Sequence, residues 1–293
     1  MNAAPPPWLP AAPCTPGRCG AHHGPGCATV RPARAVARLT AGLAVVLAGV
    51  LLAPLTALLP AHVRLWWVRW WCRAVVRAFG VRIRVTGAPA PTGGPLLVVA
   101  NHISWLDVPL LAAVLPGRMV AKREIRAWPV LGPLAARGGT LFIERDRLRA
   151  LPGTVQEMAR ALTGGGRVIV FPEGSTWCGR AAGTFRPAPF QAALDAGAAV
   201  QPVRLDYRPA GPAAFVGDDP LAASLWRIAA ARGLVAELRI LDPISSIRYT
   251  DRRALARAAQ RAVASDSANR PSVSVHQWAG SSPAAVSSAR TPA

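Results

Sequence analysis

Residues 95–107 have the sequence PLLVVANHISWLD, and this stretch decides how the fold is interpreted. An uncharged run, Pro95 to Ala100, leads directly into polar residues that can begin a helix. A short continuous apolar run of this kind is typical of a strand that is buried on both faces. The stretch therefore predicts a buried strand that ends at Ala100, followed by a helix near residues 104–115.

The same pattern recurs on both sides of this stretch, from about residue 81 to residue 264. The other strand candidates are residues 81–86, 139–144, 167–171, 199–207 and 235–241. The other helix candidates are residues 148–163, 187–196, 220–232 and 250–264. Alternation of strands and helices predicts an α/β domain with a largely parallel sheet flanked by helices. Its length, roughly 180 residues, is enough to bury a sizeable core.

The two ends of the chain have a different composition. Residues 1–30 are rich in Pro, Gly and Ala without periodicity, and residues 265–293 are rich in Ser, Ala and Pro, so both ends are predicted to be disordered tails. The first tail contains five residues of types that bind zinc. They are Cys14, Cys19, His22, His23 and Cys27. Their spacing matches no closed structural zinc site, so we expect a mobile tail there and no metal.

Between the first tail and the domain lies a long apolar run, Leu39–Leu59, which carries no charge over 21 residues. As a helix it would be about 32 Å long, enough for a bilayer core. Pro54 should kink it. A buried helix of a soluble protein is an alternative, and a cleaved signal peptide is disfavoured because a long Pro-rich leader precedes the run. We expect membrane insertion, with a full crossing and a re-entrant or monotopic helix both open.

The next stretch, residues 61–80, has the sequence AHVRLWWVRWWCRAVVRAFG and is predicted to be amphipathic. Three arginines recur at every fourth position and so form one stripe on a helix, with three tryptophans on an adjoining face. The residues are Arg69, Arg73 and Arg77, and Trp67, Trp70 and Trp71. Trp and Arg suit the lipid headgroup layer. They also bind nucleic acid, but the neighbouring apolar run makes the membrane the simpler partner, so residues 31–80 are interpreted as membrane-associating helices.

The distribution of charge agrees with a membrane partner. The chain has 34 Lys and Arg against 14 Asp and Glu, a net charge of +20, and ten arginines precede the first carboxylate, Asp107. A hydrophobic content of 52% excludes a wholly disordered chain. Five cysteines spread through a long chain do not fit a disulfide-stapled secreted domain. The basic front half predicts contact with anionic membrane lipids and no nucleic-acid partner.

The residues that could take part in a reaction lie where the strand at residues 95–100 ends. His102 and Asp107 are five residues apart at the start of a helix and can meet across one turn. Asp107 could accept a hydrogen bond from one imidazole nitrogen and leave the other as a base. Ligands of open α/β sheets bind beyond the carboxyl ends of strands. The spacing alone leaves open that Asn101 or Ser104 caps a helix and that His102 is incidental.

Four sequence blocks narrow this interpretation. They are NHISWLD at 101–107, GTLFIERDR at 139–147, VIVFPEGST at 168–176 and VQPVRL at 200–205. In this order they resemble the NHxxxxD block, the acceptor-binding block, the Phe-Pro-Glu-Gly-Thr block and the Val-x-Pro-Val strand of the glycerolipid acyltransferase superfamily. The resemblance covers roughly residues 65–210 and is specifically to bacterial 1-acylglycerol-3-phosphate (lysophosphatidic acid) acyltransferases.

The resemblance implies a direct O-acyl transfer that makes phosphatidic acid in phospholipid biosynthesis. His102 would take the proton from the free hydroxyl of 1-acylglycerol-3-phosphate, and that oxygen would attack an acyl thioester on coenzyme A or acyl carrier protein. Asp107 would orient His102 and stabilise its charged form. A thiolate leaves readily, so no enzyme nucleophile is required, and the chain has no G-x-S-x-G elbow. No metal and no cofactor other than the acyl donor is expected.

The resemblance also implies an acceptor-binding set and raises one question about it. The set is Arg145, Glu173, Gly174, Ser175 and Thr176. Many members of the superfamily have a basic residue after the third block, whereas this chain continues Trp-Cys-Gly. Either Arg180 or Arg186 supplies that charge, or the acceptor head is not a simple phosphate. Lyso-ornithine lipid acyltransferases of the same superfamily also lack that residue, so lyso-ornithine lipid or another lysolipid is the alternative acceptor.

The acyl donors implied by the resemblance are cytosolic, so we expect a bacterial inner-membrane protein whose catalytic domain faces the cytoplasm. The arginines from Arg64 to Arg84, after the apolar run, agree with the positive-inside rule, but those from Arg31 to Arg38, before it, do not. A remote alternative is a non-catalytic basic protein that binds membranes or nucleic acid. That alternative leaves the pairing of His102 with Asp107 unexplained.

Overall fold

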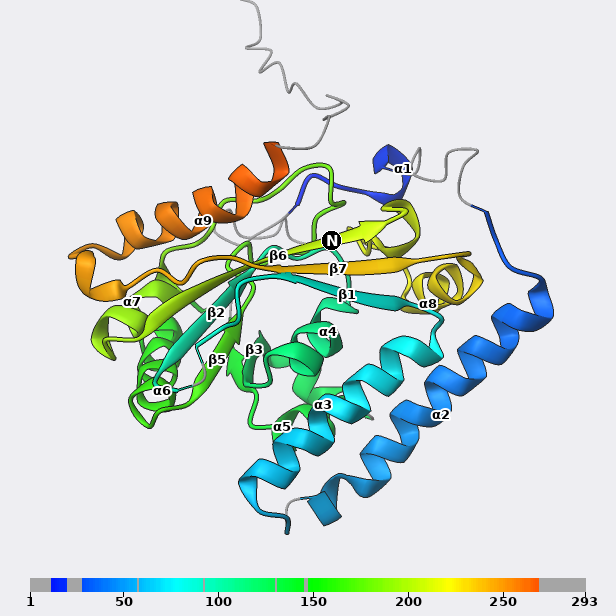
Figure 1. Cartoon of the computed structure of the whole chain (residues 1–293), viewed down its shortest axis with the longest axis horizontal. Coiled ribbons are helices and arrows are strands. Elements are labelled where there is room, and N and C mark those ends of the chain that lie inside the picture. Colours follow the sequence, from blue (N-terminus) through cyan, green and yellow to red (C-terminus); the bar gives the residue numbers. More distant parts are fainter. Residues whose placement is uncertain are drawn as a thin grey trace, which may run out of the picture.

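The computed structural model of the chain (Figure 1) describes residues 12–19, 28–56, 58–91, 93–129, 131–144 and 147–268. Its strands are β1 (Arg82–Gly87), β2 (Leu96–Ala100), β3 (Arg118–Lys122), β4 (Leu141–Ile143), β5 (Arg167–Val170), β6 (Ala199–Arg208) and β7 (Val235–Ile240). Its α-helices are α1 (Pro16–Cys19), α2 (Pro32–Thr56), α3 (Ala61–Ala78), α4 (Asp107–Val114), α5 (Leu131–Arg137), α6 (Leu151–Thr163), α7 (Ala188–Asp195), α8 (Leu221–Ala230) and α9 (Arg252–Ala268).

The seven strands form one sheet in the order β1-β7-β6-β2-β5-β3-β4. From β6 to β4 every pairing is parallel. Strand β7 pairs with β6 antiparallel and with β1 parallel, so β1 and β7 run opposite to the other five strands. The prediction of a largely parallel sheet flanked by helices is confirmed. The strands β2 and β5 are neighbours in its centre, and this adjacency positions the candidate site.

Helices cover both faces of the sheet, and β2 shows why its sequence is continuously apolar. Leu96, Val98 and Ala100 belong to a buried cluster with side chains of α3, α4 and α8. The alternate residues, Leu97 and Val99, belong to a second cluster with side chains of α6, α7 and α9. Successive residues of a strand point to opposite faces, so a strand buried on both sides has no polar position.

The predicted strands are all present, but one strand, β3, and two α-helices, α1 and α5, of the described residues were not predicted. Strand β3 lies between β5 and β4. It begins at the exposed Arg118 and ends at the exposed Lys122, so it presents no long apolar run. Helix α5 has only seven residues. At the other end of the domain, α9 extends to Ala268, slightly past the predicted start of the second tail at residue 265.

The predicted membrane-associating segment forms an antiparallel helical hairpin of α2 and α3, which packs against α4 and α8 on one side of the domain (Figure 1). Helix α2 begins and ends earlier than the predicted Leu39–Leu59 and contains Pro54 near its end. The two helices pack closely because two glycines of α2 leave room for aromatic rings, one in α3 and one directly after it. A Cβ atom on Gly42 would collide with Phe79, and one on Gly49 would collide with Trp71.

The aromatic face of α3 differs in part from the prediction. Trp67 and Trp70 lie together, with ring centroids 5.6 Å apart, and Trp70 is exposed. Trp71 turns away from them, because its indole N–H donates to the Val45 carbonyl at 2.8 Å and its ring packs over Gly49. The three arginines of the predicted stripe are exposed. They are Arg69, Arg73 and Arg77.

Part of the predicted first tail packs on the domain. Cys14 and Cys19 are buried beside Cys178, and Thr29 forms a bridge with Ala231. The structure differs here from the predicted disorder because the two thiols bury each other against the loop that contains Cys178. Three of the candidate zinc ligands lie outside the described residues. They are His22, His23 and Cys27.

Candidate active site

The candidate site lies at one edge of the sheet, where β2 and β5 end side by side. Residues 101–107 follow β2, and residues 171–186 follow β5. The two strands are parallel neighbours, so their carboxyl ends bring these segments together. The sheet topology therefore unites the first and third blocks at this edge, and the fourth block lies on β6, the other neighbour of β2.

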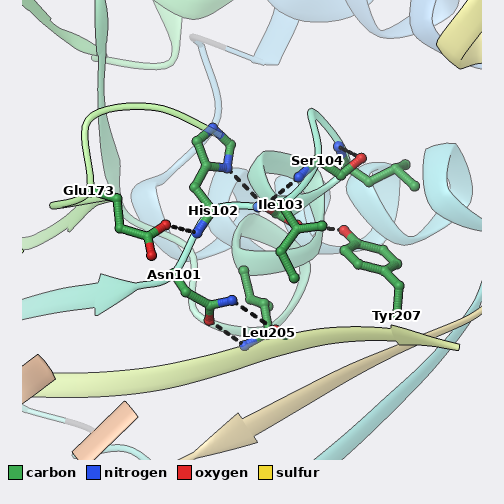
Figure 2. Close-up of polar contacts among 9 residues, drawn as sticks. Asn101, His102, Ile103, Ser104, Glu173, Leu205 and Tyr207 are labelled. Atoms are coloured by element: carbon green, nitrogen blue, oxygen red, sulfur yellow. Dashed lines mark hydrogen bonds and ion pairs between the residues drawn. The ribbon is translucent and has the colours of Figure 1, made fainter. Parts of the chain in front are cut away.

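The centre of the site is a hydrogen bond between His102 and Asp107 (Figure 2). The Nδ1 atom of His102 lies 2.8 Å from Oδ2 of Asp107. An ionised carboxylate can only accept, so Nδ1 carries the hydrogen and Nε2 has a free lone pair. Among the described residues, none hydrogen-bonds Nε2. The pair therefore presents one imidazole nitrogen for accepting a proton.

Besides His102, three further groups donate hydrogen bonds to the carboxylate of Asp107. Its carboxylate is fully buried, and Oδ2 also accepts the backbone N–H groups of Ile103 at 2.6 Å and Ser104 at 2.9 Å. Oδ1 accepts the hydroxyl of Tyr207 at 2.5 Å (Figure 2). Burial and the neighbouring charge of Asp107 raise the pKa of the Tyr207 hydroxyl well above its usual value, so Tyr207 stays a donor. These bonds fix the carboxylate in one orientation.

The backbone of His102 is clamped by the loop that follows β5. Its N–H donates to Oε2 of Glu173 at 2.8 Å, and its carbonyl accepts the N–H of Trp177 at 2.7 Å. The other oxygen of Glu173 accepts the N–H of Gly183 at 2.9 Å. Burial raises the pKa of the Glu173 carboxyl to about 7, although the two backbone donors act in the opposite direction. Glu173 thus ties the loop to His102.

The imidazole ring of His102 is held between its carboxylate partner and an aromatic ring. It stacks on Phe171 with ring centroids 4.0 Å apart and an interplanar angle of 13°. The side chain is 19% exposed and lines a cleft. A ring fixed in this way cannot rotate freely, so its free nitrogen keeps one direction toward the cleft.

Asn101 fixes the start of this segment. Its side-chain amide donates to the Leu205 carbonyl at 2.9 Å and accepts the Leu205 N–H at 2.8 Å, so it continues the pairing of β2 with β6 (Figure 2). The sequence offered Asn101 only as a helix cap. Tyr207 and Phe171 were not predicted as site residues, and no local pattern links them to His102, since their contacts arise from the neighbouring strands.

The cleft has a volume of about 2710 Å³ and extends from the helical hairpin to His102. Apolar side chains of α2 and α3 line one part, among them Leu43, Val46 and Trp67. The predicted acceptor residues Gly174, Ser175 and Thr176 also line it. Gly174 has a φ of 71°, a conformation that favours glycine. The cleft thus joins an apolar region to the site.

The remaining predicted residues are placed differently. Glu173 does not line the cleft, because both of its oxygens face backbone N–H groups. Arg145 lies outside the described residues. Of the two arginines considered for an acceptor charge, Arg186 lines the cleft and Arg180 does not.

Comparison with known proteins agrees with this geometry. The sequence model of the family described as acyltransferase matches residues 82–206. A lyso-ornithine lipid O-acyltransferase of Pseudomonas aeruginosa is 42% identical over 194 residues, which cover 64% of this chain and 72% of that protein. A 1-acyl-sn-glycerol-3-phosphate acyltransferase of Neisseria meningitidis is 37% identical over 190 residues, which cover 62% and 73%.

A solved structure shows the same fold. It is the 1-acyl-sn-glycerophosphate (LPA) acyltransferase PlsC from Thermotoga maritima, which superposes with a TM-score of 0.65 at 18% sequence identity. The match covers 82% of this chain and 97% of that protein. The fold found here, including a flanked and mostly parallel sheet, is therefore that of a known acyltransferase.

Proposed function

The chain belongs to the acyltransferase family, and from this premise we propose that it transfers a fatty acyl group from a thioester to the free hydroxyl of a single-chain lipid at a membrane. The observation that carries this proposal is the pairing of His102 with Asp107 at the wall of a cleft, with Nδ1 bound and Nε2 facing away from the carboxylate. This arrangement supplies a base without supplying a nucleophile.

In the proposed reaction, Nε2 of His102 accepts the proton of the acceptor hydroxyl as the oxygen forms a bond to the thioester carbonyl carbon. The carbon–sulfur bond of the donor then breaks, and the thiolate leaves and is protonated by His102. General-base catalysis of this kind contributes typically 10²-fold to 10⁴-fold to a rate. No covalent acyl-enzyme and no metal or cofactor takes part, and the donor is acyl-CoA or acyl carrier protein.

Asp107 acts through His102 in this scheme. The imidazole gains a positive charge when it takes the proton, and a buried carboxylate at 2.8 Å favours that charged form. The bonds from Ile103, Ser104 and Tyr207 keep the carboxylate aimed at Nδ1. Glu173 holds the backbone of His102 in place.

For the acceptor, we propose 1-acylglycerol-3-phosphate as the first candidate and phosphatidic acid as its product. Arg186 lines the cleft, and an arginine fork can pair with both oxygens of a phosphate. Gly174, Ser175 and Thr176 offer polar groups along the same wall. Arg145 is retained as a further candidate for the phosphate on the resemblance of its sequence block alone.

A second acceptor, lyso-ornithine lipid, is favoured by a specific observation. Residues 175–178, Ser-Thr-Trp-Cys, carry no positive charge, and the P. aeruginosa relative at 42% identity is named for this acceptor. Its head group carries an amine and a carboxylate, so it needs less positive charge from the protein than a phosphate does.

The test is a measurement of thiol release from acyl-CoA and from acyl carrier protein by the full chain in detergent, with each acceptor in turn. Release that requires a lysolipid supports acyl transfer, and donor hydrolysis without an acceptor, or no release, contradicts it. The ratio of kcat/KM values identifies the acceptor. Arg186→Gln should raise the KM for 1-acylglycerol-3-phosphate about tenfold, whereas Arg180→Gln, outside the cleft, serves as the matched control.

We also propose how the chain meets the membrane. Of the described helices, α2 has the length and composition to cross a bilayer. It is followed by the antiparallel α3, whose last residue leads back to β1, so the tip of the hairpin points away from the domain (Figure 1). The arginines of α3 would each cost about 3 kcal/mol at the bilayer centre. We therefore favour a hairpin that enters one leaflet and returns.

The proposed location is the inner membrane of a bacterium, with the domain on the cytoplasmic side where the acyl donors are found. Residues 31–80 would bind the membrane and its anionic lipids, and residues 81–264 would carry the acyl transfer. Labelling of single cysteines in intact cells and in inverted vesicles would test this side. Access to the domain from outside the cell would contradict it.

A further inference from the structure

A cluster of three buried cysteines lies beside the candidate site and has no role in the proposed acyl transfer. It consists of Cys14, Cys19 and Cys178, and their sulfur atoms all lie within 4.8 Å of one another. All three are free thiols and are buried together with Val216. Two of them come from the amino-terminal segment and the third from the loop after β5, so the cluster joins parts of the chain that are more than 150 positions apart.

The spacing of these sulfurs is close to that of a metal site. In a tetrahedral zinc site with bonds of about 2.3 Å, two thiolates lie about 3.8 Å apart. A separation of at most 4.8 Å therefore closes with side-chain shifts of less than about 1 Å. Three thiolates select thiophilic ions such as zinc or copper(I) over magnesium or calcium, which prefer oxygen ligands.

The backbone around the cluster is arranged to orient the sulfur of Cys178. Hydrogen bonds from the backbone of Ala181 and Arg180, and from the neighbouring thiols of Cys14 and Cys19, converge on this sulfur. Gly179, with a φ of 82°, lets the chain turn back over the sulfur. The backbone of Cys178 in turn hydrogen-bonds Cys14. Backbone donors of this kind orient thiolate ligands around a metal.

We propose that Cys14, Cys19 and Cys178 bind one thiophilic metal ion, with zinc as the first candidate, which fastens the amino-terminal segment to the loop after β5. Three thiolates can hold copper(I) in a trigonal site, whereas a tetrahedral zinc site is completed by a fourth ligand. The ion is structural, because the cluster contributes no group to the proposed reaction.

The position of the cluster predicts what the metal would stabilise. Cys178 directly follows Trp177, whose N–H binds the His102 carbonyl at 2.7 Å. The same loop contains Glu173, which binds the N–H of His102. On the other side, Gly217 lies against the amino-terminal segment, since a Cβ there would be 3.1 Å from the Cys14 carbonyl. A bound ion would therefore stabilise the position of the loop after β5, which contacts the backbone of His102.

The experiment measures the zinc and copper content of the purified full chain by mass spectrometry of the elements, after dialysis under reducing conditions. The wild type should hold about one ion per chain. Cys14→Ser and Cys178→Ser should each retain less than about one fifth of that content. Cys72→Ser is the matched control, because Cys72 is equally buried but lies in α3 away from the cluster, and it should keep the ion.

A second measurement uses only the wild type, so its result does not depend on whether the cysteine variants fold. After removal of the native metal, cobalt(II) should bind with a stoichiometry of one and give the charge-transfer absorption of thiolate ligands. Zinc should then displace it and protect Cys14, Cys19 and Cys178 from alkylation, as mapped by peptide mass spectrometry. Absence of bound metal, metal content unchanged in Cys178→Ser, or a disulfide between two of the three cysteines in the metal-treated protein would overturn the proposal.

Discussion

The segment 101–107 and the hairpin of α2 and α3 depart from ordinary burial in opposite directions. The first places charged and polar groups in the interior and satisfies them, as with the carboxylate of Asp107, which accepts four hydrogen bonds. The second leaves large apolar side chains on the surface, among them Leu51, Leu55 and Trp66. Buried polar groups are costly unless they are paired, and exposed apolar patches mark contact surfaces. The difference matches the proposed division between a region for chemistry and a region for membrane contact.

The largest effect is expected in the polar segment, from Asp107→Asn. The amide would direct an N–H at donors that now bind the carboxylate, and it could no longer stabilise a charged His102. We expect kcat to fall about 10³-fold. Asp219→Asn is the control, since Asp219 is also buried and ion-paired, with Arg227, but lies outside the site. A similar loss of rate in both variants would show a general effect of removing a buried charge, and would contradict a specific role of Asp107 in catalysis.

The hairpin should respond in the opposite way. Leu51 and Leu55 are 68% and 61% exposed, and changing both to Asp removes roughly 1.5 kcal/mol of membrane contact at each. Binding to vesicles of anionic lipid should weaken about 150-fold, while the rate with a detergent-dispersed acceptor stays within twofold. Ile247→Asp, at a residue 83% exposed outside the hairpin, should change neither quantity. Equal loss of rate in detergent would mean that the two regions are not separable.

A smaller effect is expected from Tyr207→Phe, which removes one of the donors to Asp107. Hydrogen bonds to charged groups contribute about 1.5–3 kcal/mol, and we expect kcat to fall about tenfold with KM unchanged. Tyr249→Phe is the matched control, because Tyr249 packs in the second cluster, away from Asp107. A change in KM without a change in kcat would show that Tyr207 acts on substrate binding and not on the orientation of Asp107.

The last expected effect concerns stability and pH, not catalysis. The pKa of Glu173 rises from its ordinary value to about 7 on folding, so the folded state holds a proton that the unfolded state has lost between those values. The free energy of unfolding should therefore decrease as pH rises toward 7, by up to about 1.4 kcal/mol per pH unit from this group. Urea unfolding of wild type and Glu173→Gln at several pH values isolates the contribution of Glu173 to the free energy of unfolding.

In that comparison, the wild type should lose stability relative to Glu173→Gln as pH rises from about 5 to about 7. Glu157→Gln, at an exposed position of α6, should follow the wild type. If the difference between wild type and Glu173→Gln stays constant over this range, Glu173 is ionised in the folded protein throughout.

What the sequence could predict follows from the range of the interactions. Strand β2 and the pairing of His102 with Asp107 are local, because an apolar run buried on both faces and a spacing of five residues are visible in one stretch. The common edge of β2 and β5 required only the rule that strand ends gather in a parallel sheet.

The contacts that were not predictable join distant residues or depend on neighbouring elements. Tyr207 reaches Asp107 across 100 positions, and Cys14 reaches Cys178 across more. Trp71 turns inward because Gly49 of α2 leaves space for its ring, which the periodicity of α3 alone does not reveal. Strand β3 was missed because its ends are charged and exposed, although its position between two strands decides its conformation.

The proposed catalytic base for acyl transfer to a lysolipid is Nε2 of His102. The most direct test compares wild type and His102→Ala for thiol release from acyl-CoA or acyl carrier protein with a saturating lysolipid acceptor. Circular dichroism would verify that both are folded. We expect a loss of at least about 10³-fold in kcat for His102→Ala, with membrane binding unchanged. A rate within about tenfold of wild type would contradict it.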